Sequence, residues 1–426
     1  MKHNTLLVLL LSASLGLVVH AQIRPAFFGI TPTPNSSLAH ADPFFDDTVL
    51  HEIRLAINEQ DWQSLKDHYL DNTYYTVDFT WREHTVRNAG IRSRGTGSRS
   101  GVKPGLRVDF DRYTTDQKFL GLKSFVLRNN TQDSSNMHER LSMLLFRRLG
   151  LPAPREAHTT VYVNNRYAGL FTIVESVDKS FLTRTLAEND GYLYKYDFPA
   201  DAQPYFFQDR GSNPASYVPL PFKPETHEDD PRPEFIVQLV QAINQGTATF
   251  RSAVAEYLDL QKLLRHVAVE NFVADNDGFV GDYGMNNYYL YRLQDKKQFT
   301  FIAWDKSNAF FSPTYSIFRN ITGVPSARQN QLLARALSYR DLYDYYLDTL
   351  LECVRSASEL TSGDARGWLE REIAREYGQI RDAARSDTEK PYTNDDFERA
   401  VTDLTIFAQQ RGEFVTREVA AARVQP

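Results

Sequence analysis

Residues 276–305 decide how this chain is interpreted, and they read N-D-G-F-V-G-D-Y-G-M-N-N-Y-Y-L-Y-R-L-Q-D-K-K-Q-F-T-F-I-A-W-D. An acidic loop leads to Asn287, and two β-like runs, residues 288–292 and 299–304, predict a hairpin that ends on Asp305. Such a hairpin brings a loop carboxylate, an amide and a second carboxylate together. Phosphoryl transfer uses this set to orient a nucleophile and to hold magnesium between phosphates. Asp and Asn are also common in plain turns, so spacing alone leaves both interpretations open.

The sequence up to residue 176 predicts mainly strands and one long helix. Leucines at helical spacing predict this helix over residues 136–149, and Asn136 with Glu139 predicts a capping box at its start. Leu106, Val108 and Phe110 alternate with Arg107 and Asp109, as in a strand with one buried face. Strands are expected over residues 50–57, 75–81, 86–93, 106–110, 159–163 and 167–174, and a turn followed by a buried strand is expected over residues 119–127.

The sequence after residue 177 predicts mainly helices. An insertion over residues 199–233, rich in Pro, Asp and Ser, is expected to be irregular. Helical spacing recurs over residues 235–245, 247–257, 260–272, 329–353, 365–385 and 394–420. Cys353 lies in an apolar helical context and is expected to be a buried thiol; one cysteine excludes an intrachain disulfide framework.

The first residues predict the compartment. Residues 1–21 have a basic start, an apolar run and small residues at a cleavage point, which is typical of a signal peptide. Residues 22–46 are rich in proline and predict a flexible leader. No later run is apolar enough to span a membrane, so the mature protein is expected to be secreted or periplasmic. A net charge of −6 gives no electrostatic reason to expect a nucleic-acid partner.

An ordered string of motifs over residues 50–311 resembles the CotH family of spore-coat-protein-H-like atypical secreted kinases. The motifs are F-L-G-L-K (119–123), N-M-H-E-R-L (136–141), L-G-L-P-A-P-R (149–155), V-Y-V-N-N-R-Y-A-G-L (161–170), N-Y-Y-L-Y (287–291) and I-A-W-D (302–305). The resemblance implies an α+β, two-lobed protein-kinase-like fold, with a β-rich N-lobe over residues 47–176 that holds one long helix. A mainly helical C-lobe would then span residues 177–426. It also implies transfer of a phosphoryl group from ATP, with Mg²⁺ or Mn²⁺, to a protein substrate at the cell surface or outside the cytoplasm.

The same resemblance assigns roles in the hairpin. Asp277 matches the catalytic-loop aspartate that accepts or orients the nucleophile's proton, and Asn287 and Asp305 match the metal-holding pair. Asp282 is a rival for the catalytic role because it stands five residues before Asn287, as in the ordinary kinase loop. The N-D-G context favours Asp277.

Five further residues stand at or near the nucleotide-binding positions of the family, and Arg107 is a first departure from its pattern. Arg94 opens a glycine-bearing R-G loop, which an ordinary β-turn also explains, and Glu139 matches the helix glutamate that pairs with a strand cation. Arg107 stands where the family has a strand lysine, with Lys103 as a possible substitute. Glu175 follows the last strand, where a hinge would contact adenine.

Besides Arg107, which stands in place of a lysine, a second departure from the family follows Asp305. The family commonly reads W-D-x-D, whereas this chain has Ser307 at the last position. A hydroxyl can coordinate magnesium, but it lacks the charge that neutralises a divalent ion. With Arg107, this departure supports an alternative, a catalytically impaired pseudokinase that acts as a surface or structural binding protein. A metal-dependent hydrolase is a third interpretation, weakened by the absence of an accompanying histidine cluster.

Overall fold

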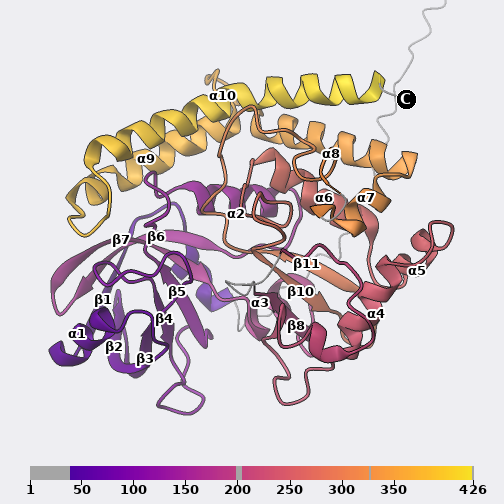
Figure 1. Ribbon diagram of the computed structural model, residues 1–426. Helices are drawn as coiled ribbons and strands as arrows, with labels where there is room; N and C mark the ends of the chain where they lie inside the picture. Colours follow the sequence, from indigo (N-terminus) through magenta and orange to yellow (C-terminus); the bar gives the residue numbers. More distant parts are fainter. Residues whose placement is uncertain (1–38, 198–203, 326–327, 425–426) are drawn as a thin grey trace, which may run out of the picture.

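The computed structural model describes residues 39–197, 204–325 and 328–424 of the chain. The predicted signal peptide and most of the predicted leader lie outside the described residues. The described chain is a mixed α+β structure with a β-barrel at one end, a smaller sheet beside it and long helices along one side (Figure 1). The α+β prediction is therefore confirmed.

Seven strands form a closed barrel in the order β1-β2-β3-β4-β5-β7-β6. Neighbouring strands are antiparallel except β1 and β6, which are parallel and close the barrel. The strands are β1 (His51–Ile57), β2 (Tyr75–Trp81), β3 (His84–Ser93), β4 (Leu106–Asp109), β5 (Ser124–Arg128), β6 (Glu156–Val163) and β7 (Arg166–Glu175).

Period-two alternation fills the barrel with aromatic and branched side chains, as the sequence predicts. Leu106 and Val108 are fully buried inside, while Arg107 points to the outer face of β4 and is half-buried. Residues 39–45, the end of the predicted flexible leader, are instead a 3-10 helix, η1 (Ala39–Phe45). Phe44 of this helix is buried against Phe79 inside the barrel, because burying its aromatic ring removes a large apolar area from water.

The predicted hairpin forms two strands of a four-stranded sheet with the order β11-β10-β8-β9. β10 (Tyr288–Arg292) and β11 (Phe299–Ala303) pair antiparallel, with Tyr288 opposite Ala303. β8 (Tyr192–Tyr196) was not predicted, and β9 (Phe222–Pro224) lies within the insertion that was expected to be irregular. Pairing with β10 and β8 therefore gives order to short segments whose own patterns are weak.

Helices occur before β9 and make up most of the chain after it. The helices are α1 (Glu59–Asp67), α2 (His138–Arg148), α3 (Lys179–Leu186), α4 (Glu234–Ile243), α5 (Phe250–Ala255), α6 (Leu260–Phe272), α7 (Gln331–Ala336), α8 (Arg340–Ala357), α9 (Trp368–Ser386) and α10 (Asn394–Val424), with a short 3-10 helix, η2 (Pro214–Ser216). α6, α8 and α10 pack together around the largest apolar core, which contains the free thiol of Cys353 as predicted. Within the described residues, none of these helices is both long and apolar enough to cross a bilayer.

The C-terminal helices also cover the barrel, and Figure 1 shows α9 and α10 running side by side above it. α9 packs on β7, where the Tyr167 hydroxyl donates to the carbonyl of Ala383 at 2.9 Å. Beyond its end, Asp387 accepts a hydrogen bond from Lys103 at 2.6 Å. The predicted division into two lobes is therefore not confirmed, because the last part of the chain contacts both the barrel and the helical core.

Candidate functional site

The end of the hairpin meets the barrel at a buried arginine, Arg128. This residue is the last of β5, and its guanidinium lies 2.7 Å from the Asp305 carboxylate while also forming an ion pair with Glu139 of α2. Arg128 and Glu139 are both buried. The strand cation that pairs with the helix glutamate is therefore Arg128, which the sequence analysis missed. The available signal was an arginine at the end of an otherwise apolar strand.

Glu139 is free for this pairing because it does not cap its helix. α2 begins at His138, two residues later than predicted, and its N-cap residue makes no side-chain cap bond. Asp133 takes the capping role by accepting a hydrogen bond from the His138 amide at 2.8 Å. The predicted capping box is therefore wrong, and Glu139 points to Arg128.

Arg94 brings a second guanidinium to the same face of the barrel. Its amide donates to the Gly105 carbonyl at 2.8 Å, and the β4–β5 register, with Leu106 opposite Leu127, brings Gly105 beside Arg128. Within the described chain, the Arg94 side chain makes no hydrogen bond or ion pair, and its guanidinium lies 5.7 Å from the Trp304 ring. Burial and the nearby Arg128 lower the pKa of Arg94 to about 10. This is a positive position without a counter-ion in the described chain, and it favours an anion.

Asp277 lies at the start of the hairpin loop among three amide side chains. Its carboxylate accepts hydrogen bonds from Asn286 at 3.0 Å, from Asn287 at 3.2 Å and from Asn308 at 3.3 Å. Burial raises the pKa of Asp277, and the repulsion of Asp275 adds to this effect. A carboxylate held in place by donors, with a raised pKa, is suited to accept a proton.

Lys306 lies in a buried ion cluster next to the loop that carries Asp277. Its ammonium is fully buried, forms an ion pair with Glu270 and lies 2.9 Å from the Asp275 carboxylate. Burial disfavours its charge, but these two carboxylates outweigh burial and raise the pKa of Lys306. Asp275 in turn accepts from the Asp277 amide at 3.1 Å. The ion cluster therefore sets the position of the backbone at Asp277.

Asn287 and Asp305 lie at neighbouring ends of the two hairpin strands, where the Trp304 amide donates to the Asn287 carbonyl at 3.3 Å. One Asp305 oxygen accepts from Arg128 and, at 2.9 Å, from Ser307. Burial opposes ionisation, but Arg128 outweighs it and holds the pKa of Asp305 well below its usual range. Within the described residues, the second Asp305 oxygen and the amide oxygen of Asn287 accept no hydrogen bond. These are hard oxygen donors of the kind that Mg²⁺ prefers.

Two of the predicted nucleotide-binding residues are engaged elsewhere. The Lys103 ammonium is buried 2.6 Å from the Asp387 carboxylate, and this ion pair compensates its positive charge. Glu175 binds Arg155 and Arg184 and lies buried between them. The structure does not bring Lys103 or Glu175 to the cluster around Asp305.

Arg107 and Asp282 can also be placed. Arg107 faces outward opposite Val126, two residues before Arg128, so it shares the face of the site, and it donates to Ser124 at 3.0 Å. Asp282 forms an ion pair with Arg319 at 2.8 Å, and Asn320 donates to it at 2.9 Å, so its pKa is lowered. Asp282 is therefore tied into the loop by its own partners, whereas Asp277 lies among the amides beside Asn287.

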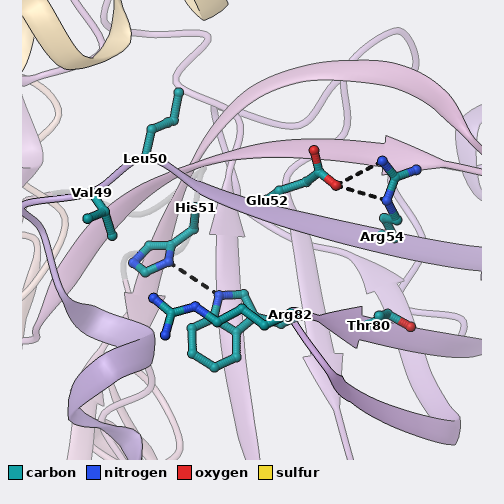
Figure 2. Close-up of a pocket in the computed structure, with 8 residues that line it drawn as sticks. Val49, Leu50, His51, Glu52, Arg54, Thr80 and Arg82 are labelled. Atoms are coloured by element: carbon teal, nitrogen blue, oxygen red, sulfur yellow. Dashed lines mark hydrogen bonds and ion pairs between the residues drawn. The ribbon is translucent and has the colours of Figure 1, made fainter.

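The described chain contains no group of three or more His, Cys, Asp or Glu side chains arranged to hold a metal ion. A cavity of about 320 Å³ opens at the barrel wall over β1 and the end of β2 (Figure 2). Four of its polar side chains are engaged in pairs, since Trp81 donates to His51 and Glu52 pairs with Arg54. None of the predicted site residues lines this cavity.

Comparison with known proteins defines the class. The family model described as CotH kinase protein matches residues 91–415, so the chain is a kinase-like protein of mixed α+β fold. The chain belongs to the CotH kinase protein family.

A similar protein is the inner spore coat protein H of Bacillus subtilis (strain 168), which is 27% identical over 317 residues, covering 72% of this chain and 80% of that protein. A crystal structure of a Helicobacter pylori proinflammatory kinase, CtkA, aligns with 75% of this chain and 95% of its own at 8% identity, with a TM-score of 0.29. The resemblance inferred from the sequence motifs is thus confirmed at the level of the family.

Proposed function

We propose that this protein transfers a phosphoryl group from a magnesium–nucleotide complex, with ATP as the nucleotide, to a hydroxyl group of a protein outside the cytoplasm. The observation that carries the proposal is the contact of Arg128 with both Glu139 and Asp305. This contact joins the barrel, the helix α2 and the hairpin at one point. A phosphoryl-transfer site of this kind needs a cation, a helix glutamate and a metal-binding aspartate close together.

Each side chain then has one task. Arg94 and Arg128 bind phosphate oxygens, and Glu139 holds Arg128 in place for that contact. Asp277 orients the acceptor hydroxyl and takes its proton as the new P–O bond forms. The proton leaves the nucleophile, the bond to the leaving diphosphate breaks, and the arginines offset the negative charge that develops there.

The oxygen atoms at the hairpin end fit a magnesium ion. Asn287 and Asp305 would hold it through the two oxygens that accept no hydrogen bond in the described chain. When bound, the ion offsets charge on the phosphates. Mn²⁺ prefers the same oxygen donors and is the alternative metal.

The wider organisation of the protein is part of the proposal. Residues 47–176 and 177–426 would act as the two lobes of a kinase-like fold, with the nucleotide between Arg94 on the barrel and Asp277 on the hairpin loop. The predicted signal peptide over residues 1–21 would send the protein out of the cytoplasm, which makes it secreted or periplasmic.

A second candidate function is favoured by the surroundings of Asp305. Ser307 and Arg128 both donate to one of its oxygens, and no second acid stands at position 307 to share the charge of a metal ion. A site with this reduced negative charge supports the alternative of a pseudokinase that binds a partner without transferring phosphate.

Incubation of the purified protein with labelled ATP and Mg²⁺ or Mn²⁺, together with a generic acceptor protein, tests these alternatives. We expect label on the acceptor or on the protein itself. Nucleotide binding without transfer would favour the pseudokinase, and release of free phosphate alone would favour a hydrolase.

The replacement Arg94→Gln tests the anion-binding role of Arg94. Because this guanidinium has no ion-pair partner in the described chain, its loss leaves no carboxylate uncompensated, so the melting temperature is expected to stay unchanged. Affinity for MgATP, measured by calorimetry, is expected to fall by about 10-fold to 100-fold, as for a lost hydrogen bond to a charged group. Arg82→Gln is the matched control, because Arg82 stacks on Trp81 at the cavity over β1 and β2, which none of the predicted site residues lines. Equal affinities for both variants would remove Arg94 from the site.

A further inference from the structure

The side chain of Asn129 holds the segment that joins β3 to β4, residues 94–105, which is here named the β3–β4 segment. Asn129 directly follows Arg128, the last residue of β5, and it is buried. Its side-chain amide donates one hydrogen bond to the Ser98 carbonyl and one to the Lys103 carbonyl, each at 2.8 Å. Both N–H groups of this amide are therefore bound to the backbone of one segment.

Further bonds shape the β3–β4 segment itself. The Arg94 amide donates to the Gly105 carbonyl at 2.8 Å, which joins the two ends of the segment. On the side of β5, the Thr131 hydroxyl makes a longer bond to the Ser98 carbonyl, at 3.4 Å. The two short bonds that fix the segment to the end of β5 therefore come from Asn129.

The position of this segment matters because it sets the distance between two cations. The guanidinium carbons of Arg94 and Arg128 lie 5.7 Å and 5.9 Å from the centre of the Trp304 ring. Arg128 is paired with Glu139 and Asp305, whereas Arg94 has no carboxylate partner in the described chain. The two positive charges repel each other, so uncharged contacts must hold Arg94 beside Arg128 until an anion binds.

We propose that Asn129 is a positioning residue that holds the β3–β4 segment against the end of β5 and thereby keeps Arg94 beside Arg128. The proposal rests on the proposed function, because these two arginines would bind the phosphate groups of the nucleotide. Without the Asn129 amide, the carbonyls of Ser98 and Lys103 lose their donors, and the segment turns them toward water. Arg94 then moves away from Arg128 and no longer binds the same phosphate groups.

The replacement Asn129→Leu tests this role, because it removes both donors and nearly keeps the size of the side chain. Affinity for MgATP, measured by calorimetry, is expected to fall by about tenfold, as for a lost neutral hydrogen bond. In transfer assays the KM for ATP should rise by a similar factor, while kcat stays close to the wild-type value because the hairpin with Asp277 is unchanged. A purely structural defect would instead reduce the amount of active protein and leave the KM unchanged.

Thr172→Val is the matched control. Thr172 lies on β7 opposite Arg128, and its hydroxyl accepts a hydrogen bond from the Asn130 amide at 3.1 Å. This replacement removes a buried hydrogen bond next to Arg128 and leaves the bonds of the β3–β4 segment in place. Its affinity for MgATP is expected to equal that of the wild type.

A double-mutant cycle identifies the residue through which Asn129 acts. In the Arg94→Gln background, Asn129→Leu should cause no further loss of affinity, because the guanidinium that it positions is already gone. Two losses that add in full would overturn the proposal, and so would an affinity of Asn129→Leu equal to that of the wild type.

Hydrogen exchange of the full chain without nucleotide provides a readout that needs no kinase activity. The Arg94 amide should exchange faster in Asn129→Leu than in the wild type and in Thr172→Val, whereas the amides of α6 should be unaffected. If it does, but none of the proteins binds MgATP, the proposed function fails while the role of Asn129 in holding the segment stands. Unchanged exchange contradicts that role itself. Asn129→Ala, which removes the same donors, is measured in the same way if Asn129→Leu does not fold.

Discussion

The variant Asp277→Asn is expected to lose phosphoryl transfer by a factor of about 10² to 10⁴, the usual contribution of a general base. The asparagine keeps the shape of the side chain but cannot accept a proton from the acceptor hydroxyl. Nucleotide affinity should change little, because Arg94 and Arg128 lie across the site on the barrel. Transfer is measured with labelled ATP under single-turnover conditions, and affinity is measured separately by calorimetry.

Asp282→Asn is the matched control for this variant. Asp282 is the other candidate for the catalytic role, and its carboxylate is bound by Arg319 and Asn320 in the loop. Removing its charge breaks a partly exposed ion pair, which lowers the free energy of unfolding by about 0–1 kcal/mol. Phosphoryl transfer should stay intact. The reverse pattern, with loss in Asp282→Asn and activity in Asp277→Asn, would move the catalytic role to Asp282.

The largest effect on stability is expected for Lys306→Met. Lys306 lies fully buried between Glu270 and Asp275, and removing its ammonium would leave two buried carboxylates without a cation. Breaking a buried ion pair in this way lowers the free energy of unfolding by about 3–5 kcal/mol. Chemical denaturation monitored by circular dichroism measures the change. Activity should fall as well, because Asp275 holds the Asp277 amide.

Lys297→Met is a matched control at the surface. Lys297 lies 2.8 Å from Glu256, and both side chains are more than half exposed, at 57% and 58%. Water screens this pair, so its loss is expected to leave the free energy of unfolding almost unchanged. A cost for Lys306→Met as small as that for Lys297→Met would show that the buried cluster does not stabilise the fold. Adding Glu270→Gln to Lys306→Met should recover part of the lost stability, since one uncompensated charge is then removed.

The sequence predicted local features well. The alternation of Leu106, Val108 and Phe110 and the hairpin that ends on Asp305 have the expected faces and pairing, because both depend on neighbouring residues and period-two spacing. The long helix was also predicted, but its start was wrong. Asp133, five residues before the first helical residue, supplies the cap in place of Asn136.

Contacts between distant segments could not be predicted in this way. Arg128 and Asp305 are 177 positions apart, and the apolar run before Arg128 indicates only a buried strand. The lysine position of the family points to Arg107 and Lys103 and not to Arg128. A charged side chain is buried only where the fold brings it a partner of opposite charge. The partner of Lys103 lies 284 positions away in the sequence.

The bond between Lys103 and Asp387 bears on the order in which the protein is completed during synthesis. The Lys103 ammonium has its carboxylate partner only after residue 387 has left the ribosome, when most of the chain is already made. Until then, closing the barrel around this side chain would bury a charge without a partner, which is costly. The segment between β3 and β4 that carries Arg94 is therefore expected to settle last. In a nascent chain that is stopped before residue 387, this segment should be cleaved by proteases. In a chain that is released after residue 387 has been made, the segment should be protected.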